Sequence, residues 1–500
     1  MPCEAKMSNP LEELRDECKR MIEEAASKAY PGVDLPDLKL SEPPSPNMGE
    51  LSSPLCFQLA RVLRSKPVDV AENLVRRMDL IPSSLVESAE ASAGYVNFHV
   101  DVGNFAKVVL GTATKDEGYG FIKIAKPEKV MVEHTSANPI HPITVGTARN
   151  SILGACLAGM LKRRGHEVVV HFLVNDMGRQ VAMAAYGWRL LGMPEPEGRP
   201  DTWVGTVYAS VNVLSEIKRL KAEIEAARTS DEKGKNDEAK KQLQRYEEAA
   251  KDLRARNAEV FDALAKKIDA DPDPEAKIVS LNTAYEEGRP EVKRAIRKLV
   301  GYCLRGFEET LGGIGIGFDS FDYESDLVWR KAADVVLEGL KATPYASVDK
   351  GALILDCDRI AEDLGLKKRW GLNLEHEIPR LVLVRSDGTT LYTLRDIAYS
   401  QWKFQRVEKV INIIGYEQTL AQLQLRIALA ALGQIEMGDR QTHYAYELVR
   451  LPDFKMSGRL GKYITLTEVI DRSVELAYKE VTERSKHLPK EQRAEIARMV

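Results

Sequence analysis

A strand, a helix and a second strand follow one another between residues 129 and 174, and this order constrains the fold more than any other feature of the sequence. Residues 129–134 form an apolar run that indicates a buried strand, and residues 167–174 form another. Between them, residues 148–164 carry apolar side chains on one helical stripe. Two strands joined by a helix in this way lie parallel in one sheet. We therefore predict an α/β fold built on a parallel sheet.

The α/β pattern is interrupted by a long helical region and then resumes. Residues 215–268 are dense in Lys, Glu, Arg and Ala, with apolar residues at helical spacing on both sides of a polar turn. We predict a helical hairpin inserted into the α/β domain, within a helical region of about 205–300, whose charges mostly face solvent. Strand-like runs at 381–384, 409–414 and 443–449 indicate that the α/β pattern continues after it.

The two ends of the chain differ from this central part. The first hundred residues predict a compact α+β unit, with helices over 11–29, 55–63 and 69–78 and a strand over 93–100. Near the other end, residues 466–483 predict a helix, and Pro489 suits the first position of another. The sequence thus predicts three parts: an N-terminal domain over 1–120, an α/β domain over 121–465 and the start of a helical region over 466–500.

Composition excludes several classes of protein. The chain has 500 residues and a net charge of -4, which argues against a histone-like coat of positive charge but leaves room for a local basic patch. The six cysteines lie far apart without a Cys-x-x-Cys pair, so we expect reduced thiols in a cytoplasmic protein rather than a zinc ribbon or a disulfide scaffold. No apolar run approaches the roughly 18 residues of a membrane span, and residues 1–7 lack the apolar core of a secretory signal.

The loop after the first strand is the first candidate for chemistry. It runs from Glu133 to Asn150 and connects the carboxyl end of a predicted parallel strand to the start of a helix. Ligands bind at that edge of open α/β sheets, and the free amides of a helix N-terminus attract phosphate. Gly146 would let the backbone approach a nucleotide closely. A strand, a loop and a helix with one glycine are weak evidence when taken alone.

A second candidate lies about 300 residues further on. Lys455-Met456-Ser457-Gly458-Arg459 follows a predicted strand and forms a short basic loop. Such a loop can bind phosphates whose negative charge grows in a transition state. By itself it would be interpreted as an exposed basic turn.

Together the two segments resemble the HIGH and KMSKS signatures of class I aminoacyl-tRNA synthetases, and in particular arginyl-tRNA synthetases of the archaeal or eukaryotic kind. The resemblance covers nearly the whole chain and implies a Rossmann-like catalytic domain with a helical insertion, preceded by a small α+β domain. The matching segments are 46–50, 94–98, 133–139 with 149–150, 174–180, 321–322 with 324–325, 391–396 and 455–459.

Two departures from the family pattern concern the nucleotide site. The HIGH tetrapeptide is replaced by Thr144-Val145-Gly146-Thr147, so the two imidazoles that the resemblance places near the ATP phosphates are missing. Hydroxyl groups of Thr144 and Thr147 can donate hydrogen bonds but are never cationic, and a lost charged donor costs about 1.5–3 kcal/mol. We expect a slower or retuned activation step, or an inactive paralogue, with His141 supplying part of the missing positive charge. The second departure is Gly458, although Arg459 occurs in variants of the family motif.

The resemblance also implies an arginine site. A guanidinium group needs planar acceptors in a bidentate arrangement. Glu324 and Asp396 would hold it together with Tyr392. Asn138 and Glu133 would hold the α-amino and carboxylate ends. A single carboxylate outside such motifs would be interpreted as part of a surface salt bridge.

Other positions are implied less directly. Gln418 is a candidate near the amino acid or the adenosine, with Glu417 as its rival, and His443 is a candidate near ATP. For tRNA, Tyr95 and Asn97 match positions that contact the tRNA elbow, although Asn97 could equally be a turn or edge-strand residue. Phosphate contacts need only a stripe of basic residues. Candidate clusters are Arg61, Arg64 and Lys66, then Arg76 and Arg77, and Lys367, Lys368 and Arg369.

The sequence therefore predicts an arginine–tRNA ligase. It would use ATP with Mg²⁺, L-arginine and tRNA(Arg), act as a monomer, and hold no metal ion of its own. Two alternatives remain: a synthetase-like paralogue with altered or lost aminoacylation, and a non-catalytic tRNA-binding scaffold that uses the helical hairpin. Family members continue into a helical anticodon-binding domain, and this chain stops inside a helical pattern. We expect that domain to be truncated or absent.

Overall fold

The computed structural model describes residues 9–115, 119, 124–227, 233–386, 388–449 and 457–500. The chain divides into two compact units, one of residues 1–124 with 163–165 and one of residues 125–162 with 166–500. In the described residues no helix is long and apolar enough to cross a membrane.

The first unit is α+β, as predicted. Its antiparallel sheet has the order β1-β3-β2, formed by Leu51–Ser53, Tyr95–Val100 and Val86–Ser92. Its helices are α1 (Pro10–Ala29), α2 (Leu55–Leu63), α3 (Pro67–Val75) and α4 (Val102–Lys115), with a 3-10 turn η1 (Pro46–Met48). Its core contains the fully buried side chains of Leu14, Ile22, Leu59, Leu74 and Phe98.

Local chemistry explains where these elements begin. Asn9 caps α1 by accepting a hydrogen bond from the Leu11 amide, and Pro10 suits the first helical position. Helix α3 begins at Pro67, two residues before the predicted start, for the same reason. Strand β3 begins at Tyr95 rather than at residue 93, because Ala93 and Gly94 both have positive φ and form the turn before it.

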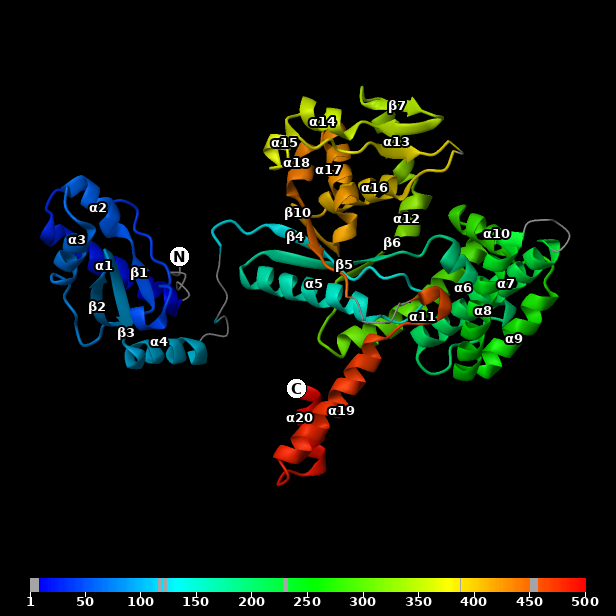
Figure 1. The fold of residues 1–500 in the computed structure, drawn as a ribbon, viewed down its shortest axis with the longest axis horizontal. Helices are drawn as coiled ribbons and strands as arrows, with labels where there is room; N and C mark the ends of the chain where they lie inside the picture. The colour runs from blue at the N-terminus through cyan, green and yellow to red at the C-terminus, as the bar shows by residue number, and fades with distance from the viewer. Residues whose placement is uncertain (1–8, 116–118, 120–123, 228–232, 387, 450–456) are drawn as a thin grey trace, which may run out of the picture. The chain divides into compact units, whose positions relative to one another are not determined.

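The second unit is built on a parallel sheet, which confirms the predicted fold class. The five strands have the order β11-β10-β4-β5-β6, and every neighbouring pair is parallel. They are β4 (Lys129–Glu133), β5 (Glu167–Val174), β6 (Ser320–Tyr323), β10 (Lys409–Gly415) and β11 (Gln441–Tyr446). Helix α5 (Val145–Arg163) connects β4 to β5 and lies along the sheet in Figure 1. Its Ala158 packs on Val130 and Val132 of β4.

The described residues between β5 and β6 form six helices, and Figure 1 shows them as one group. The predicted hairpin corresponds to α7 and α8. The group is wider than the predicted 205–300, because α6 starts soon after β5. Its members are α6 (Arg179–Leu190), α7 (Pro200–Ala227), α8 (Lys233–Arg256), α9 (Ala258–Ala270), α10 (Pro274–Glu286) and α11 (Pro290–Gly312).

A second insertion separates β6 from β10, and here one prediction was wrong. Residues 381–384 form β9, but this strand belongs to a separate antiparallel sheet β7-β8-β9 instead of the parallel one. A short apolar run indicates a strand without indicating its partners. The insertion contains β7 (Ala346–Asp349), β8 (Ala352–Leu355), β9 (Leu381–Val384), α12 (Glu324–Trp329), α13 (Ala332–Lys341), α14 (Cys357–Asp363), α15 (Leu366–Arg369) and α16 (Tyr392–Phe404).

The remaining elements follow β10. They are η2 (Tyr416–Gln418), α17 (Thr419–Ala431), α18 (Ile435–Arg440), β11, η3 (Gly458–Leu460), α19 (Leu466–Arg484) and α20 (Lys490–Met499). Strand β11 begins two residues before the predicted start. Thr465 and Glu468 form a capping box at the start of α19, which explains its sharp beginning. Pro489 is the N-cap of α20 and not its first helical residue.

Candidate active site

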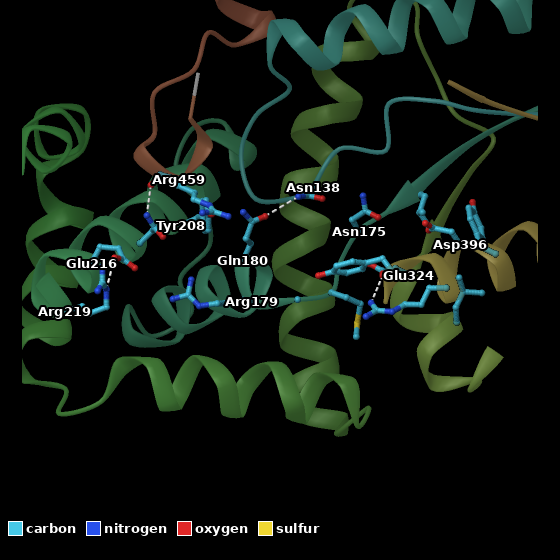
Figure 2. Close-up of a pocket in the computed structure, with 18 of the residues that line it drawn as sticks. Asn138, Asn175, Arg179, Gln180, Tyr208, Glu216, Arg219, Glu324, Asp396 and Arg459 are labelled. Carbon is cyan, nitrogen blue, oxygen red and sulfur yellow. Dashed lines mark hydrogen bonds and ion pairs between the residues drawn. The ribbon is translucent and has the colours of Figure 1, made fainter. Parts of the chain in front are cut away.

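A cavity of about 810 Å³ opens beside the carboxyl ends of the parallel strands. Its walls come from segments far apart in the sequence, which is the usual place for a ligand in this kind of sheet. In Figure 2, Glu324 and Asp396 lie at one end, Arg459 and Tyr208 at the other, and Asn138 and Gln180 between them. The lining residues are Asn138, Leu173, Asn175, Met177, Gly178, Arg179, Gln180, Tyr208, Asn212, Glu216, Arg219, Gln242, Tyr246, Glu324, Leu327, Tyr392, Arg395, Asp396, Tyr399 and Arg459.

The loop that carries Asn138 has a strained backbone. Thr135 and Ser136 both have positive φ, 70° and 39°, which residues with a β-carbon rarely adopt. Hydrogen bonds hold this shape: the Thr135 amide donates to Asn150 Oδ1 at 2.6 Å, and the Ser136 carbonyl accepts from Asn175 Nδ2 at 3.1 Å. The loop therefore presents Asn138, whose Nδ2 donates to Gln180 at 3.3 Å, in one fixed position.

The acidic end of the cavity gathers the three residues predicted to hold a guanidinium group. Glu324 opens α12, and Tyr392 and Asp396 lie on the first turns of α16. A guanidinium group is already present there, because Arg395 Nη1 donates to Glu324 Oε1 at 2.6 Å. Burial raises the pKa of the Glu324 carboxyl, and the charge of Arg395 opposes this shift. The site is thus shaped for planar cations.

Asp396 has the most perturbed carboxyl group of the cavity. It lies within the wall of the cavity, and its side chain is exposed to the cavity that it lines. Burial, followed by the negative charges of Glu324 and Glu133, raises the pKa of Asp396 to about 7. A bound cation would favour the ionised form, so this carboxyl group is suited to receive a positively charged ligand.

Glu133 does not line the cavity, although the sequence predicted it as a ligand residue. Its carboxylate is buried at the end of β4, and Lys403 Nζ lies 2.7 Å from its Oε2. Lys403 also donates to Asn412 Oδ1 at 2.9 Å, and the Ser136 hydroxyl donates to the other oxygen of Glu133 at 3.2 Å. The charge of Glu133 is therefore neutralised by Lys403 inside the protein. Its hydrogen bond with Ser136 helps to hold the loop after β4.

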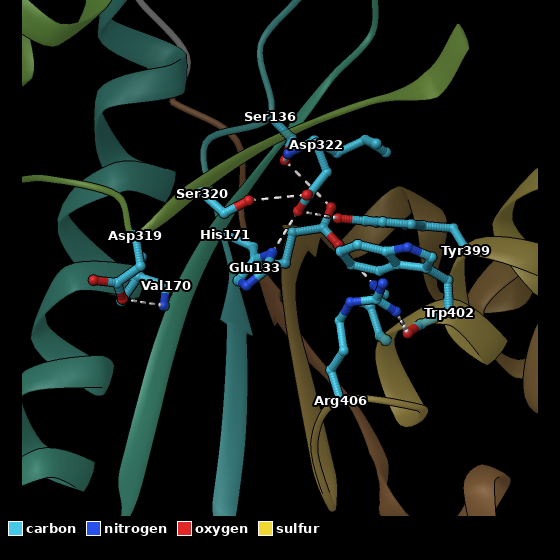
Figure 3. A network of polar contacts seen from close by, with 12 residues as sticks. Glu133, Ser136, Val170, His171, Asp319, Ser320, Asp322, Tyr399, Trp402 and Arg406 are labelled. Carbon is cyan, nitrogen blue, oxygen red and sulfur yellow. Dashed lines mark hydrogen bonds and ion pairs between the residues drawn. The ribbon is translucent and has the colours of Figure 1, made fainter. Parts of the chain in front are cut away.

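A second polar network lies next to this pair, as Figure 3 shows. His171 on β5 contacts Asp322 on β6 through Nδ1, and Ser320 donates to the same carboxylate at 2.9 Å. Tyr399, which lines the cavity, donates to Asp322 at 3.4 Å. The Tyr399 and Trp402 rings stack with centroids 5.5 Å apart. The network links two neighbouring strands to one wall of the cavity.

The Thr144–Thr147 segment forms the start of α5. Thr144 is the residue before the helix, and its Oγ1 accepts from the Thr147 amide at 3.4 Å, which is a capping bond. The same segment pairs with the stretch before α19, because Val145 donates to the Ile464 carbonyl at 3.1 Å and Leu466 donates to the Ile143 carbonyl at 2.8 Å. The first signature segment is therefore joined by backbone hydrogen bonds to residues 464–466, which follow the second segment in the chain.

His141 lies against the second signature segment. A β-carbon on Gly458 would come within 3.0 Å of the His141 ring, so only glycine fits there without a shift. His141 Nδ1 contacts the Pro142 carbonyl at 2.9 Å, and burial lowers the pKa of the imidazole below its ordinary value. This favours the neutral ring. The expectation that His141 replaces missing positive charge is therefore not supported.

The structure describes only part of the basic loop. Lys455 and Met456 lie outside the described residues. The Ser457 amide donates to the Lys462 carbonyl at 2.6 Å, which closes a tight turn, and Arg459 lines the cavity. Arg459 is therefore the one described residue of this motif that reaches the site.

Gln418, Glu417 and His443 do not line the cavity. Gln418 ends η2 and is exposed, and the Glu417 carboxylate folds back over Gly415. His443 on β11 contacts the Ile414 carbonyl through Nε2 at 3.0 Å. Glu417 and Gln418 directly follow the carboxyl end of β10, and His443 lies on the neighbouring strand β11.

The two tRNA candidates in the first unit differ. Tyr95 is 41% exposed and packs edge-on against Phe57, which is also exposed, with ring centroids 5.0 Å apart. Asn97 is 3% exposed, and its Oδ1 accepts from the Ser52 hydroxyl at 2.7 Å. Asn97 therefore lies in the central strand of the sheet and not in the turn or edge strand that the sequence left open, and its buried side chain contacts Ser52.

The predicted basic clusters also differ. Four of the arginines in the first unit are exposed, namely Arg61, Arg64, Arg76 and Arg77. In the second unit Lys367 is buried beside Asp358 at 2.8 Å, and Arg369 pairs with Asp439. The cluster over 367–369 is therefore largely neutralised.

Sequence reasoning missed several lining residues, although it included their segment in the resemblance. Asn175 and Asp176 directly follow β5, a position that the same strand-end rule would have selected. Asn175 lines the cavity, whereas Asp176 is fully buried, accepts from the Ser325 amide at 3.0 Å and forms an ion pair with Arg297 at 3.2 Å. Among the described residues, no group of three His, Cys, Asp or Glu side chains could hold a metal ion.

Comparisons with known proteins agree with this geometry. A family model for the arginyl tRNA synthetase N terminal domain matches residues 16–100, and one for the class I (R) tRNA synthetase catalytic domain matches residues 232–500. An arginine–tRNA ligase of Saccharolobus solfataricus is 41% identical over 442 residues, covering 87% of this chain and 68% of the relative. An arginine–tRNA ligase of Sulfurisphaera tokodaii is 38% identical over 490 residues, covering 95% of this chain and 74% of the relative.

Solved structures of arginyl-tRNA synthetases also match this chain. The arginyl-tRNA synthetase of Thermus thermophilus matches with a TM-score of 0.62 at 25% identity, covering 97% of this chain and 73% of that one. The arginyl-tRNA synthetase of Plasmodium falciparum shares the fold, with a TM-score of 0.55 at 13% identity over 96% of this chain and 71% of that one. The chain therefore belongs to the arginyl-tRNA synthetases, a family of class I aminoacyl-tRNA synthetases.

Proposed function

We propose that this chain is an arginine–tRNA ligase, which joins L-arginine to ATP and transfers the arginyl group to the 3′ end of tRNA(Arg). The observation that supports this most is one cavity that brings Asn138, Glu324, Tyr392, Asp396 and Arg459 together from separate segments. Acidic groups lie at one end and a cationic group at the other. An amino acid with a guanidinium side chain fits the first, and a nucleotide phosphate fits the second.

We assign the arginine side chain to the acidic end. Glu324 and Asp396 would accept its N–H donors, with Tyr392 beside them at the cavity mouth. A bound arginine would share the Glu324 carboxylate with Arg395, and two carboxylate oxygens offer about four acceptor positions. Asn138 would then bind the polar end of the amino acid. Because Glu133 is paired with Lys403, we assign it the role of supporting this loop.

We assign the ATP phosphates to the space between the start of α5 and Arg459. The amides after Thr144 and the positive end of the helix dipole attract phosphate, and Arg459 adds a charged donor. Attack of the arginine carboxylate on the α-phosphorus needs no protein base, so correct placement and charge stabilisation carry the step. Mg²⁺ would arrive with ATP and neutralise its phosphates, since the described residues offer no metal cluster of their own.

We assign tRNA contacts in the first unit to Tyr95. Its ring and that of Phe57 offer exposed faces on which a base can stack, and the exposed arginines of α2 and α3 can bind phosphates. We further propose a monomer in the cytoplasm. The described cysteines are free thiols, as expected in a reducing compartment, and sedimentation of the purified chain would test the monomer.

Pyrophosphate exchange tests this proposal. Full-length folded protein with ATP, Mg²⁺ and tRNA(Arg) is expected to exchange pyrophosphate in the presence of arginine and not of lysine. Asp396→Asn is expected to raise the arginine KM about ten- to a hundredfold, because one charged hydrogen bond is lost. The control Asp349→Asn changes an exposed aspartate on β7, outside the cavity, and should leave KM unchanged. No arginine-dependent exchange by the folded protein would contradict the proposal.

A further inference from the structure

The inserted helices α7 and α8 contact the turn that follows the basic loop. This turn covers Ser457–Lys462 and is closed by two backbone hydrogen bonds, from Ser457 to Lys462 at 2.6 Å and back at 3.0 Å. The sequence predicted that the charges of the hairpin mostly face solvent. Several of its side chains instead hold this turn by apolar and polar contacts.

The apolar contact is made by the middle of the turn. Leu460 is 6% exposed and belongs to a cluster with Ala209 and Val213 of α7 and Leu253 of α8. The next residue, Gly461, has φ +63°, and a β-carbon on it would lie 2.8 Å from Leu253. The turn is therefore packed so closely on the two helices that its backbone cannot shift without opening the cluster.

Two hydrogen bonds hold the backbone on either side of Leu460, and an ion pair holds the side chain of Lys462. Asn212 Nδ2 of α7 donates to the Arg459 carbonyl at 3.0 Å. Arg256 Nη1, at the end of α8, donates to the Gly461 carbonyl at 2.7 Å. Asp252 of α8 forms an ion pair with Lys462, with Nζ and Oδ2 3.4 Å apart. All three partners belong to the hairpin.

The same stretch is held on its other side by the start of α5. The backbone hydrogen bonds of Ile143 and Val145 with residues 464–466 fix it there. Arg459, whose carbonyl Asn212 holds, lines the cavity, and Figure 2 shows it beside Tyr208 of α7. The turn is thus fixed between the insertion and the helix N-terminus that we assign to phosphate binding.

We propose that the α7–α8 hairpin positions Arg459 for the activation step, with Asn212, Asp252 and Arg256 as positioning residues that act through the 457–462 turn. The effect on activation rests on the proposed function. The contact by which the hairpin holds the 457–462 turn does not depend on it. It assigns a mechanical role to an insertion that would otherwise be a solvated spacer.

Two arginines on one helix provide a matched test. Arg256→Ala removes the contact with Gly461, whereas Arg254→Ala, two residues earlier, removes only a pair with Asp262. We expect Arg256→Ala to raise the ATP KM in pyrophosphate exchange about three- to tenfold, because a partly solvated charged hydrogen bond is lost. Arg254→Ala should match the parent protein. Arg256→Lys should recover part of the loss.

A charge exchange tests the third contact independently. Asp252→Lys places two like charges together, and Lys462→Asp does the same, so each should raise the ATP KM about two- to fivefold. The double variant restores an opposite-charge pair and should return most of the way to the parent value. Parent-like KM in Arg256→Ala and in both single charge variants would overturn the inference.

Hydrogen exchange separates this inference from the proposed function. Amides of residues 457–465 are expected to exchange faster in Arg256→Ala than in Arg254→Ala, at equal melting temperature. If the parent protein shows no arginine-dependent pyrophosphate exchange, the proposed function fails, and the amide protection still decides whether the hairpin anchors the turn. Equal protection in the two variants would overturn the anchoring, whatever the activity.

Discussion

Asp396 connects the acidity of the cavity to ligand binding. Burial and its neighbouring carboxylates raise its pKa to about 7. Below that pH the carboxyl group is mostly neutral and attracts a guanidinium group weakly, while above it the carboxylate is charged. We expect the arginine KM in pyrophosphate exchange to fall as pH rises from about 6 to about 8, and to lose this dependence in Asp396→Asn. A parent profile identical to that of the variant would contradict this prediction.

The raised pKa of Asp396 also affects the free energy of unfolding: a higher pH favours arginine binding but makes the folded state less stable. In the unfolded chain the Asp396 carboxyl ionises at its ordinary pKa, so between about pH 4 and pH 7 the folded state retains a proton that the unfolded state has lost. The contribution of this group to the free energy of unfolding therefore falls as pH rises through that window. Asp396→Asn is expected to resist urea better than the parent at pH 8 while binding arginine less well. A lower urea midpoint at pH 8 for Asp396→Asn than for the parent would refute this prediction.

Lys403 and Glu133 form a pair in which neither charge is exposed to water. Their side chains are 3% and 9% exposed, and 270 residues separate them in the sequence. Lys403→Met would leave the Glu133 carboxylate buried without a positively charged partner, at a cost of about 3–5 kcal/mol in the free energy of unfolding. Adding Glu133→Gln should recover much of that loss. Urea titration followed by circular dichroism would measure both.

An exposed pair provides the control for this prediction. Lys341 and Glu338 are 44% and 70% exposed and 2.8 Å apart. Lys341→Met should change the free energy of unfolding by no more than about 0.5 kcal/mol, because water replaces the lost partner. Similar losses from Lys403→Met and Lys341→Met would show that burial of the first pair has no energetic consequence.

At the scale of elements, helix α5 shows how closely the loop after β4 is packed. A β-carbon on Gly154 would lie 2.3 Å from the His134 ring, whereas one on Gly159, in the same helix, would meet nothing within 4 Å. Alanine stabilises a helix interior by about 1 kcal/mol relative to glycine when space allows. We therefore expect Gly159→Ala to raise the melting temperature and Gly154→Ala to lower it. Two changes of the same sign would contradict this interpretation.

At the scale of the whole molecule, the first unit has what an independent domain needs. It has its own sheet and a core that includes Leu14, Ile22 and Phe98. Its length is typical of single domains. We expect a fragment of residues 1–115 to fold alone and to unfold in one cooperative thermal transition. A fragment without a cooperative transition, by circular dichroism, would show that this core depends on the rest of the chain.

Strand and helix periods are local properties, so the sequence pattern alone predicted the parallel sheet and the helical insertion, while the site residues were implied by the resemblance to a known family. Through the family resemblance it also selected five residues that share the cavity: Asn138, Glu324, Tyr392, Asp396 and Arg459. It could not place β9 in its own sheet, since an apolar run does not specify its partner strand.

Only the tertiary structure decided which charges and side chains meet. The pairing of Glu133 with Lys403, the burial of Asn97 and the contact of Arg256 with the 457–462 turn all join segments far apart in the chain. Such contacts depend on how inserted elements fold back onto the sheet. A local pattern can show that a residue is polar and follows a strand, but only packing decides whether it faces a cavity or another charge.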